Sequence, residues 1–137
     1  MLDMTNHLKI GGFVLNRWRK YCIWGYKEPN HTHHWIHAAY YKALKYLGAN
    51  VVWLDDHDLL VDLHDTLVIT EGQVDKNLPI VDDCFYVTLN SSRDYPRNRR
   101  LWIQTYTDAC LKYNVREVAK GCFFDGECLF QCWATDS

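Results

Sequence analysis

Short apolar runs separated by polar loops characterise the chain from residue 21 onward. Four runs have the length and composition of buried strands: residues 21–26, 50–54, 66–70 and 84–89. Residues 101–105 fit a further strand, and residues 106–113 fit a short helix. Residues 1–20 are weakly patterned, so we treat them as an N-terminal extension that is partly disordered or adds a strand around residues 12–15.

An amphipathic helix is predicted directly after the first polar loop. Its apolar positions recur at spacings of three and four and form one stripe: Ile36, Ala39, Tyr40, Ala43, Leu44 and Leu47. Thr32 is the expected N-cap residue. Gly48 stands where a left-handed C-terminal cap is expected.

The order strand, helix, strand over residues 21–54 predicts a βαβ unit and a parallel sheet. No amphipathic helix fits between the third and fourth strands, where the sequence has only a loop that contains Pro79. Near the C-terminus, Asp125-Gly126 separates two apolar runs, which is a strong hairpin signal. We therefore predict an α/β fold: a Rossmann-like three-layer domain over residues 21–137, with a mostly parallel sheet and a C-terminal β-hairpin.

Composition and charge exclude several classes of protein. Of the 137 residues, 48% are hydrophobic, which is enough to build a core and excludes intrinsic disorder. A net charge of −2 gives no basis for binding nucleic acid through its phosphates. No apolar run approaches the roughly 18 residues of a membrane span, and the first residues lack the order of a secretory signal. We expect a cytoplasmic protein whose six cysteines are free and mostly buried thiols.

The polar loops that follow the first four strands contain the candidate chemistry. They are residues 26–34, 55–58, 71–76 and 90–93. In open α/β sheets, ligands bind outside the carboxyl ends of the strands. The four loops should therefore gather at one edge of the sheet and form a site there.

The first loop is rich in histidine, with His31, His33 and His34 at the expected start of the helix and His37 one turn later. His33 and His37 share a helix face, as two metal ligands would, but position 34 lacks the glutamate of a H-E-x-x-H motif. Alternatively, the helix N-terminus receives an anionic or hydroxyl-rich ligand, and the histidines donate hydrogen bonds or act as a base. Capping by solvated histidines explains the same pattern, so all three interpretations stay open, and we predict no metal.

Carboxylates follow the second and third strands. Asp55 stands where a dinucleotide fold places its ribose-binding acid, but no G-x-G-x-x-G precedes it, which disfavours an NAD site and leaves an acidic turn as the simpler interpretation. Glu71 and Asp75 flank Gly72, and either carboxylate could act as a general base at a strand end. An exposed turn is the alternative for this loop.

Arginines cluster around Pro96, where Arg97 and Arg99 could bind phosphate through their guanidinium groups. A solvated surface loop explains the same residues, and we favour it. No cofactor is predicted.

Several segments together resemble a group of glycosyltransferase-like proteins from bacteria and large DNA viruses. They are Tyr21-Cys-Ile-Trp-Gly-Tyr26, His31-Thr-His-His34, Tyr41-Lys-Ala-Leu-Lys-Tyr-Leu-Gly48, Val52-Trp-Leu-Asp-Asp56, Ile69-Thr-Glu-Gly-Gln-Val-Asp75 and Trp133-Ala-Thr-Asp136. The resemblance covers about residues 20–136. It implies the N-terminal, acceptor-side half of a GT-B type enzyme, in which two Rossmann-like domains face each other across a cleft.

By position, the resemblance places the histidine and Glu71 loops at that cleft. It implies Glu71 or Asp75 as the base, with His33 as the next candidate, and a sugar or glycan acceptor near His31, His34, Asp55 and Asn90. A nucleotide-sugar donor would bind a second domain. We expect the chain to stop before that domain and to be inactive alone. A non-catalytic Rossmann-like binding or regulatory module is the alternative, and the missing glycine-rich loop disfavours a nucleotide-dependent enzyme.

Overall fold

The computed structural model describes residues 9–10, 13–14, 17–58, 61–104, 116–119, 122–124 and 128–130. Its strands are β1 (Lys9–Ile10), β2 (Phe13–Val14), β3 (Lys20–Trp24), β4 (Val51–Leu54), β5 (Thr66–Glu71), β6 (Phe85–Leu89), β7 (Arg100–Gln104), β8 (Arg116–Ala119), β9 (Cys122–Phe124) and β10 (Cys128–Phe130). In this part of the chain they are joined by the α-helix α1 (His34–Tyr46) and the 3-10 helix η3 (Arg97–Arg99).

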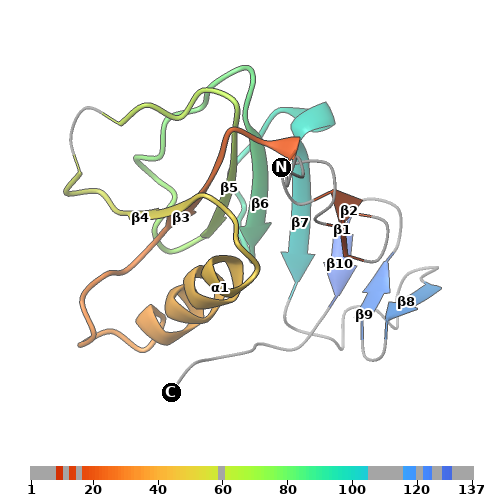
Figure 1. Ribbon diagram of the computed structural model, residues 1–137, viewed down its shortest axis with the longest axis horizontal. Helices are drawn as coiled ribbons and strands as arrows, with labels where there is room; N and C mark the ends of the chain where they lie inside the picture. The colour runs from red at the N-terminus through yellow and green to blue at the C-terminus, as the bar shows by residue number, and fades with distance from the viewer. Residues whose placement is uncertain are drawn as a thin grey trace, which may run out of the picture.

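Eight strands form one sheet in the order β4-β3-β5-β6-β7-β10-β9-β8 (Figure 1). Each neighbouring pair from β4 to β10 is parallel, and β9 and β8 continue the sheet in antiparallel pairing. The predicted α/β fold with a mostly parallel sheet is confirmed. The antiparallel pairing of β9 with β10 is confirmed too, while the Asp125-Gly126 turn and the helix predicted over residues 106–113 lie outside the described residues.

The extension before β3 contributes a strand pair of its own. β1 and β2 pair antiparallel as a separate two-stranded sheet, with Ile10 opposite Phe13. The strand that the sequence suggests around residues 12–15 therefore corresponds to β2.

Alternate residues of the central strands face two different apolar clusters. In β3, Tyr21 and Ile23 pack in the cluster that includes Ile36 and Leu44 of α1, which lies against this face of the sheet (Figure 1). The opposite face is covered without a described helix, by side chains from the irregular connections: Leu63, Leu78 and Tyr95. The loop around Pro79 thus takes the place of a helix, as the sequence predicts.

The helix starts later than its capping pattern predicts. Its N-cap is His33 rather than Thr32, and no side chain caps it. The physical reason lies in the backbone: the N–H groups of His34 and Trp35 donate three residues back, whereas the His37 N–H donates four residues back, to the His33 carbonyl at 3.2 Å, so bonding of α-helical spacing starts from His33. The buried stripe also differs from the prediction, because His37 is buried while Ala43 is exposed.

The end of the helix matches the prediction. Gly48 has a φ of 84°, in the left-handed region. The Gly48 N–H donates to the Lys45 carbonyl and the Ala49 N–H donates to the Leu44 carbonyl, each at 3.0 Å. This pair of bonds is a Schellman motif.

Two further expectations concern membrane-spanning segments and the cysteines. No helix among the described residues has the length and apolar character that crossing a membrane requires. Cys22 and Cys84 are free and buried, as predicted, and burial raises the pKa of the Cys22 thiol to about 12. Cys110 and Cys132 lie outside the described residues.

Replacing Gly48 tests the C-terminal cap. Gly48→Ala should lower the free energy of unfolding by about 1–2 kcal/mol, because an L-residue pays this cost in the left-handed region. Gly48→Asn is the matched control and should lose less, since asparagine enters that region more readily. Urea unfolding measures both, and an alanine variant as stable as the wild type would contradict the assignment.

Candidate functional site

The order of the central strands reverses at one point. The chain leaves β3 through α1 to reach β4 on one side, whereas β5 pairs with β3 on the other side. The loops that follow β3 and β5 therefore diverge from adjacent strand ends. In open α/β sheets, ligands bind outside the carboxyl ends of the strands at such a reversal.

A histidine and a buried carboxylate meet at this point. Nδ1 of His33, which precedes α1, lies 2.6 Å and 2.7 Å from the two carboxylate oxygens of Glu71, the last residue of β5. The side chains are 14% and 4% exposed, respectively. Since an ionised carboxylate only accepts hydrogen bonds, Nδ1 carries a proton in this contact, and in the neutral ring the lone pair then resides on Nε2.

Burial makes the Glu71 carboxylate more basic than an ordinary glutamate. Desolvation raises its pKa, and the negative charge of Asp75 acts in the same direction. The hydrogen bond from His33 opposes both effects. Glu71 therefore depends on His33 for most of the interaction that its charged form requires.

His37 is a second histidine beside Glu71, one turn into the helix. It is 2% exposed, and its Nε2 lies 3.7 Å from Glu71 Oε1, which is beyond hydrogen-bond distance. Burial, with a contribution from the charge of His33, lowers its pKa from 6.5 to about 4. The ring occupies the space in which a Cβ at Gly25 would lie, 2.3 Å from the ring atoms. His37 is thus a neutral, closely packed imidazole at neutral pH.

Asp75, the second carboxylate of the predicted pair, has different contacts. Its Oδ2 accepts hydrogen bonds from the Ser91 hydroxyl at 2.5 Å and the Tyr95 hydroxyl at 2.7 Å. The guanidinium of Arg93 donates to the backbone carbonyls of Asp75 and Leu78. These bonds tie the loop after β5 to the segment after β6. The geometry therefore gives Asp75 a bracing role and leaves Glu71 as the carboxylate that contacts a histidine.

The other histidines of the first loop lie around Tyr26. The His31 ring stacks on Tyr26 with a centroid separation of 3.8 Å, and its Nδ1 accepts the His33 N–H at 3.1 Å. His34 Nδ1 donates to the Tyr26 carbonyl at 3.1 Å, and its ring packs on Trp53, at 5.1 Å between ring centroids. His31 therefore belongs to the immediate surroundings of His33, whereas His34 belongs to the packing of α1 against β4.

Asp55 and Asn90 shape the neighbouring loops. Asp55 Oδ1 accepts the His57 N–H at 2.9 Å and so stabilises the turn after β4. Asn90 has a φ of 51°, and its carbonyl oxygen would lie 2.5 Å from a Cβ at Gly72. Gly72 thus allows a close approach between the two loops rather than between the backbone and a ligand.

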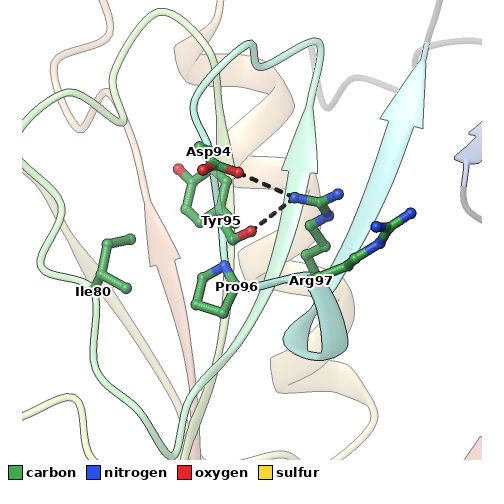
Figure 2. A pocket seen from close by; sticks show the side chains of 6 residues that line it. Ile80, Asp94, Tyr95, Pro96 and Arg97 are labelled. Atoms are coloured by element: carbon green, nitrogen blue, oxygen red, sulfur yellow. Dashed lines mark hydrogen bonds and ion pairs between the residues drawn. The ribbon is translucent and has the colours of Figure 1, made fainter.

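The arginines lie at the opposite edge of the sheet, because η3 precedes β7 and β7 runs parallel to β6. Figure 2 shows the cavity of about 480 Å³ at this place, lined by Ile80, Asp94, Tyr95, Pro96, Arg97 and Arg100. Arg100 donates to the Tyr95 carbonyl at 2.7 Å and lies 3.4 Å from Asp94 (Figure 2). Arg99 is not among the lining residues, and the Asp94 carboxylate opposes an anion. Phosphate binding by Arg97 and Arg99 stays a prediction.

Sequence reasoning includes Tyr26 and Ser91 in the candidate loops without giving either a role, and it misses Tyr95. Tyr95 lies in a stretch of polar and basic residues that resembles an exposed loop, yet it is 1% exposed. The large aromatic side chain of Tyr95 was the one feature of the sequence that could have indicated a buried position. Among the described residues, no group of three or more His, Cys, Asp or Glu side chains is placed to hold a metal ion.

Comparisons with protein families, with curated proteins and with solved structures find no match to this chain. The candidate function therefore has to be argued from the site itself.

A double-mutant cycle tests the contact between His33 and Glu71. The cycle of His33→Gln and Glu71→Gln should give a coupling energy of about 1.5–3 kcal/mol, the range for hydrogen bonds to charged groups. The matched control is the cycle of His64 and Asp62, another histidine–carboxylate pair with Nδ1 and Oδ1 3.0 Å apart but largely exposed. Urea unfolding should give a clearly smaller coupling for the exposed pair, and equal couplings would contradict the assigned role of burial.

The pH dependence of stability tests whether His37 is neutral in the folded protein. Below pH 6.5 the unfolded chain binds a proton at this histidine, whereas the folded chain does so only near pH 4. Stability should therefore fall as the pH falls through this window, by up to about 3 kcal/mol from this residue. His37→Leu should show a flatter dependence between these limits, and Glu71 is present in both proteins. Identical slopes would show that His37 is protonated in the folded state.

Proposed function

We propose that this chain is the Rossmann-like, acceptor-side domain of a glycosyltransferase, and that His33 with Glu71 is its general base. The observation that carries the proposal is the 2.6 Å contact between His33 Nδ1 and the Glu71 carboxylate at the reversal of strand order. Transfer of a sugar to a hydroxyl group requires a group that removes the hydroxyl proton. A histidine oriented by a carboxylate is such a group.

In the proposed reaction, His33 Nε2 takes the proton of the acceptor hydroxyl as its oxygen attacks the anomeric carbon of the donor. The new C–O bond forms while the bond to the nucleotide phosphate breaks, and the nucleotide leaves with that electron pair. Glu71 holds the ring in the Nδ1–H tautomer and stabilises the imidazolium that results. Because Glu71 is buried, this stabilisation acts in a medium of lower effective dielectric than water.

The resemblance to GT-B type proteins supports the remaining parts of the proposal. The nucleotide-sugar donor would be bound by a second domain, and this chain alone would transfer no sugar. A cytoplasmic location agrees with a nucleotide-sugar donor and stays a prediction.

Ligand titration tests the proposal on the chain itself. Monosaccharides and disaccharides should produce saturable NMR shifts in the amides of residues 26–34 and 71–75, while nucleotides should not. A lack of response to every sugar, or nucleotide binding in these loops, would contradict the acceptor-side assignment. Sugar binding that persists while the extended chain transfers no sugar would instead support the non-catalytic module.

Kinetic measurements on the chain joined to its proposed donor domain test the base. His33→Gln and Glu71→Gln should each lower kcat by about 10²–10⁴-fold, the range for loss of a general base. KM for the acceptor should change much less, because His33 and Glu71, which we call the dyad, are proposed to act on the proton and not to bind the sugar ring. His64→Gln is the control, because His64 is exposed and lies just before β5, at the opposite end of that strand from Glu71. Retention of kcat in both dyad variants would remove the proposed role.

A further inference from the structure

A small cavity lies at the same edge of the sheet as the dyad, and neither His33 nor Glu71 lines it. Its volume is about 180 Å³. The lining comes from the loops that follow β3, β4 and β5: Gly25, Tyr26, Lys27, Glu28, Asp55, Asp56, His57 and Val74. Three separate loops at the carboxyl edge of the sheet therefore contribute to one concave surface.

Bonds between the loops hold the walls of this cavity in place. Lys27 Nζ contacts Asp58 Oδ2 at 2.9 Å, which joins the loop after β3 to the loop after β4. Asn77 donates to Asp56 Oδ2 at 3.2 Å, and the Trp24 indole donates to the Val74 carbonyl at 3.1 Å. The cavity is thus formed before any ligand arrives, as small-molecule sites usually are.

Tyr26 connects the cavity to the dyad. It lines the cavity, stacks on His31, and lies 6.4 Å from the His33 ring between centroids. Burial raises the pKa of Tyr26, and the negative charges of Glu71 and Asp56 act in the same direction. A ligand in the cavity would therefore lie one aromatic residue away from the proposed base.

The size and charge of the lining restrict the ligand. The cavity is smaller than the roughly 300–1,000 Å³ of sites for drug-sized molecules, so it suits a single small ring. Its lining has three carboxylates, on Glu28, Asp55 and Asp56, and one lysine whose charge is matched by Asp58. This excess of negative charge disfavours a ligand that carries a phosphate or carboxylate group. The carboxylate oxygens of the lining can accept hydrogen bonds from the hydroxyl and ammonium groups of a ligand.

We propose that this cavity is the subsite for one pyranose ring of the acceptor and that it prefers an amino sugar to a neutral sugar, and a neutral sugar to an acidic one. The role as an acceptor subsite rests on the proposed function. The binding preference does not, because it follows from the volume and charge of the lining alone.

Three sugars with the same ring test the preference: glucosamine, glucose and glucuronate, which carry a positive charge, no charge and a negative charge at pH 7. Titrations followed through the amides of Tyr26 and Asp56 should give affinities in that order, with at least a threefold change at each step. One molar salt should reduce the differences, because it screens exposed charges. Glucuronate binding as tightly as glucosamine, or no sugar shifting these amides, would overturn the proposal.

Two variants test whether the charge preference arises from the lining of the cavity. Asp56→Asn should reduce the preference for glucosamine over glucuronate at least threefold. Asp82→Asn removes an equal charge from an exposed position outside the lining and should leave the preference unchanged. Equal effects of the two variants would mean that the preference comes from the overall charge of the chain, and would overturn the subsite.

The subsite and the general base can fail independently. If the preference for glucosamine holds while kcat does not depend on His33 or Glu71, the general base fails and the subsite stands. If kcat depends on the dyad but the three sugars bind without preference, only the subsite fails.

Discussion

The arrangement of this edge of the sheet depends on one buried carboxylate. Glu71 ends β5, every residue of which is buried, so the strand that forms the core also removes the carboxylate from water. A charge in such a position is costly unless it is paired. His33 supplies the pairing, and this contact ties the start of α1 to the end of β5 and places a proton on Nδ1 of the ring. The closely packed His37, seated on Gly25, lies 3.7 Å from the same carboxylate.

A second set of buried bonds keeps Glu71 at the strand end. Asp75 accepts from Ser91 and Tyr95, and Arg93 binds backbone carbonyls of the same loop. Desolvation and the bond to Asp75 raise the pKa of Tyr95, so it stays a hydroxyl donor. Asp75 and Glu71 are four residues apart and similarly buried, yet their partners differ in kind. Asp75 accepts hydrogen bonds from hydroxyl groups and connects two loops. Glu71 instead contacts a histidine, a side chain that can exchange a proton near neutral pH.

Local patterns predict much of this fold and fail where distant segments meet. The strands over residues 66–70 and 84–89, the helix and the Gly48 cap follow from periodicity and from the backbone freedom of glycine. The same rules place the Glu71 and histidine loops at one edge. They cannot show that the ring of His33 meets Glu71, 38 residues away. Nor can they separate Glu71 from Asp75, because that distinction depends on Ser91 and Tyr95 in a later segment.

The central claim is that His33 donates from Nδ1 to an ionised Glu71. Nitrogen-15 NMR of the histidine rings at neutral pH measures it most directly, since it distinguishes a protonated ring nitrogen from one that carries a lone pair. The account predicts a proton on Nδ1 and a lone pair on Nε2 for neutral His33, and a loss of this preference in Glu71→Gln. A His33 ring with its proton on Nε2 in the wild-type chain would contradict the account, because the nitrogen proposed to act as the base would then have no lone pair.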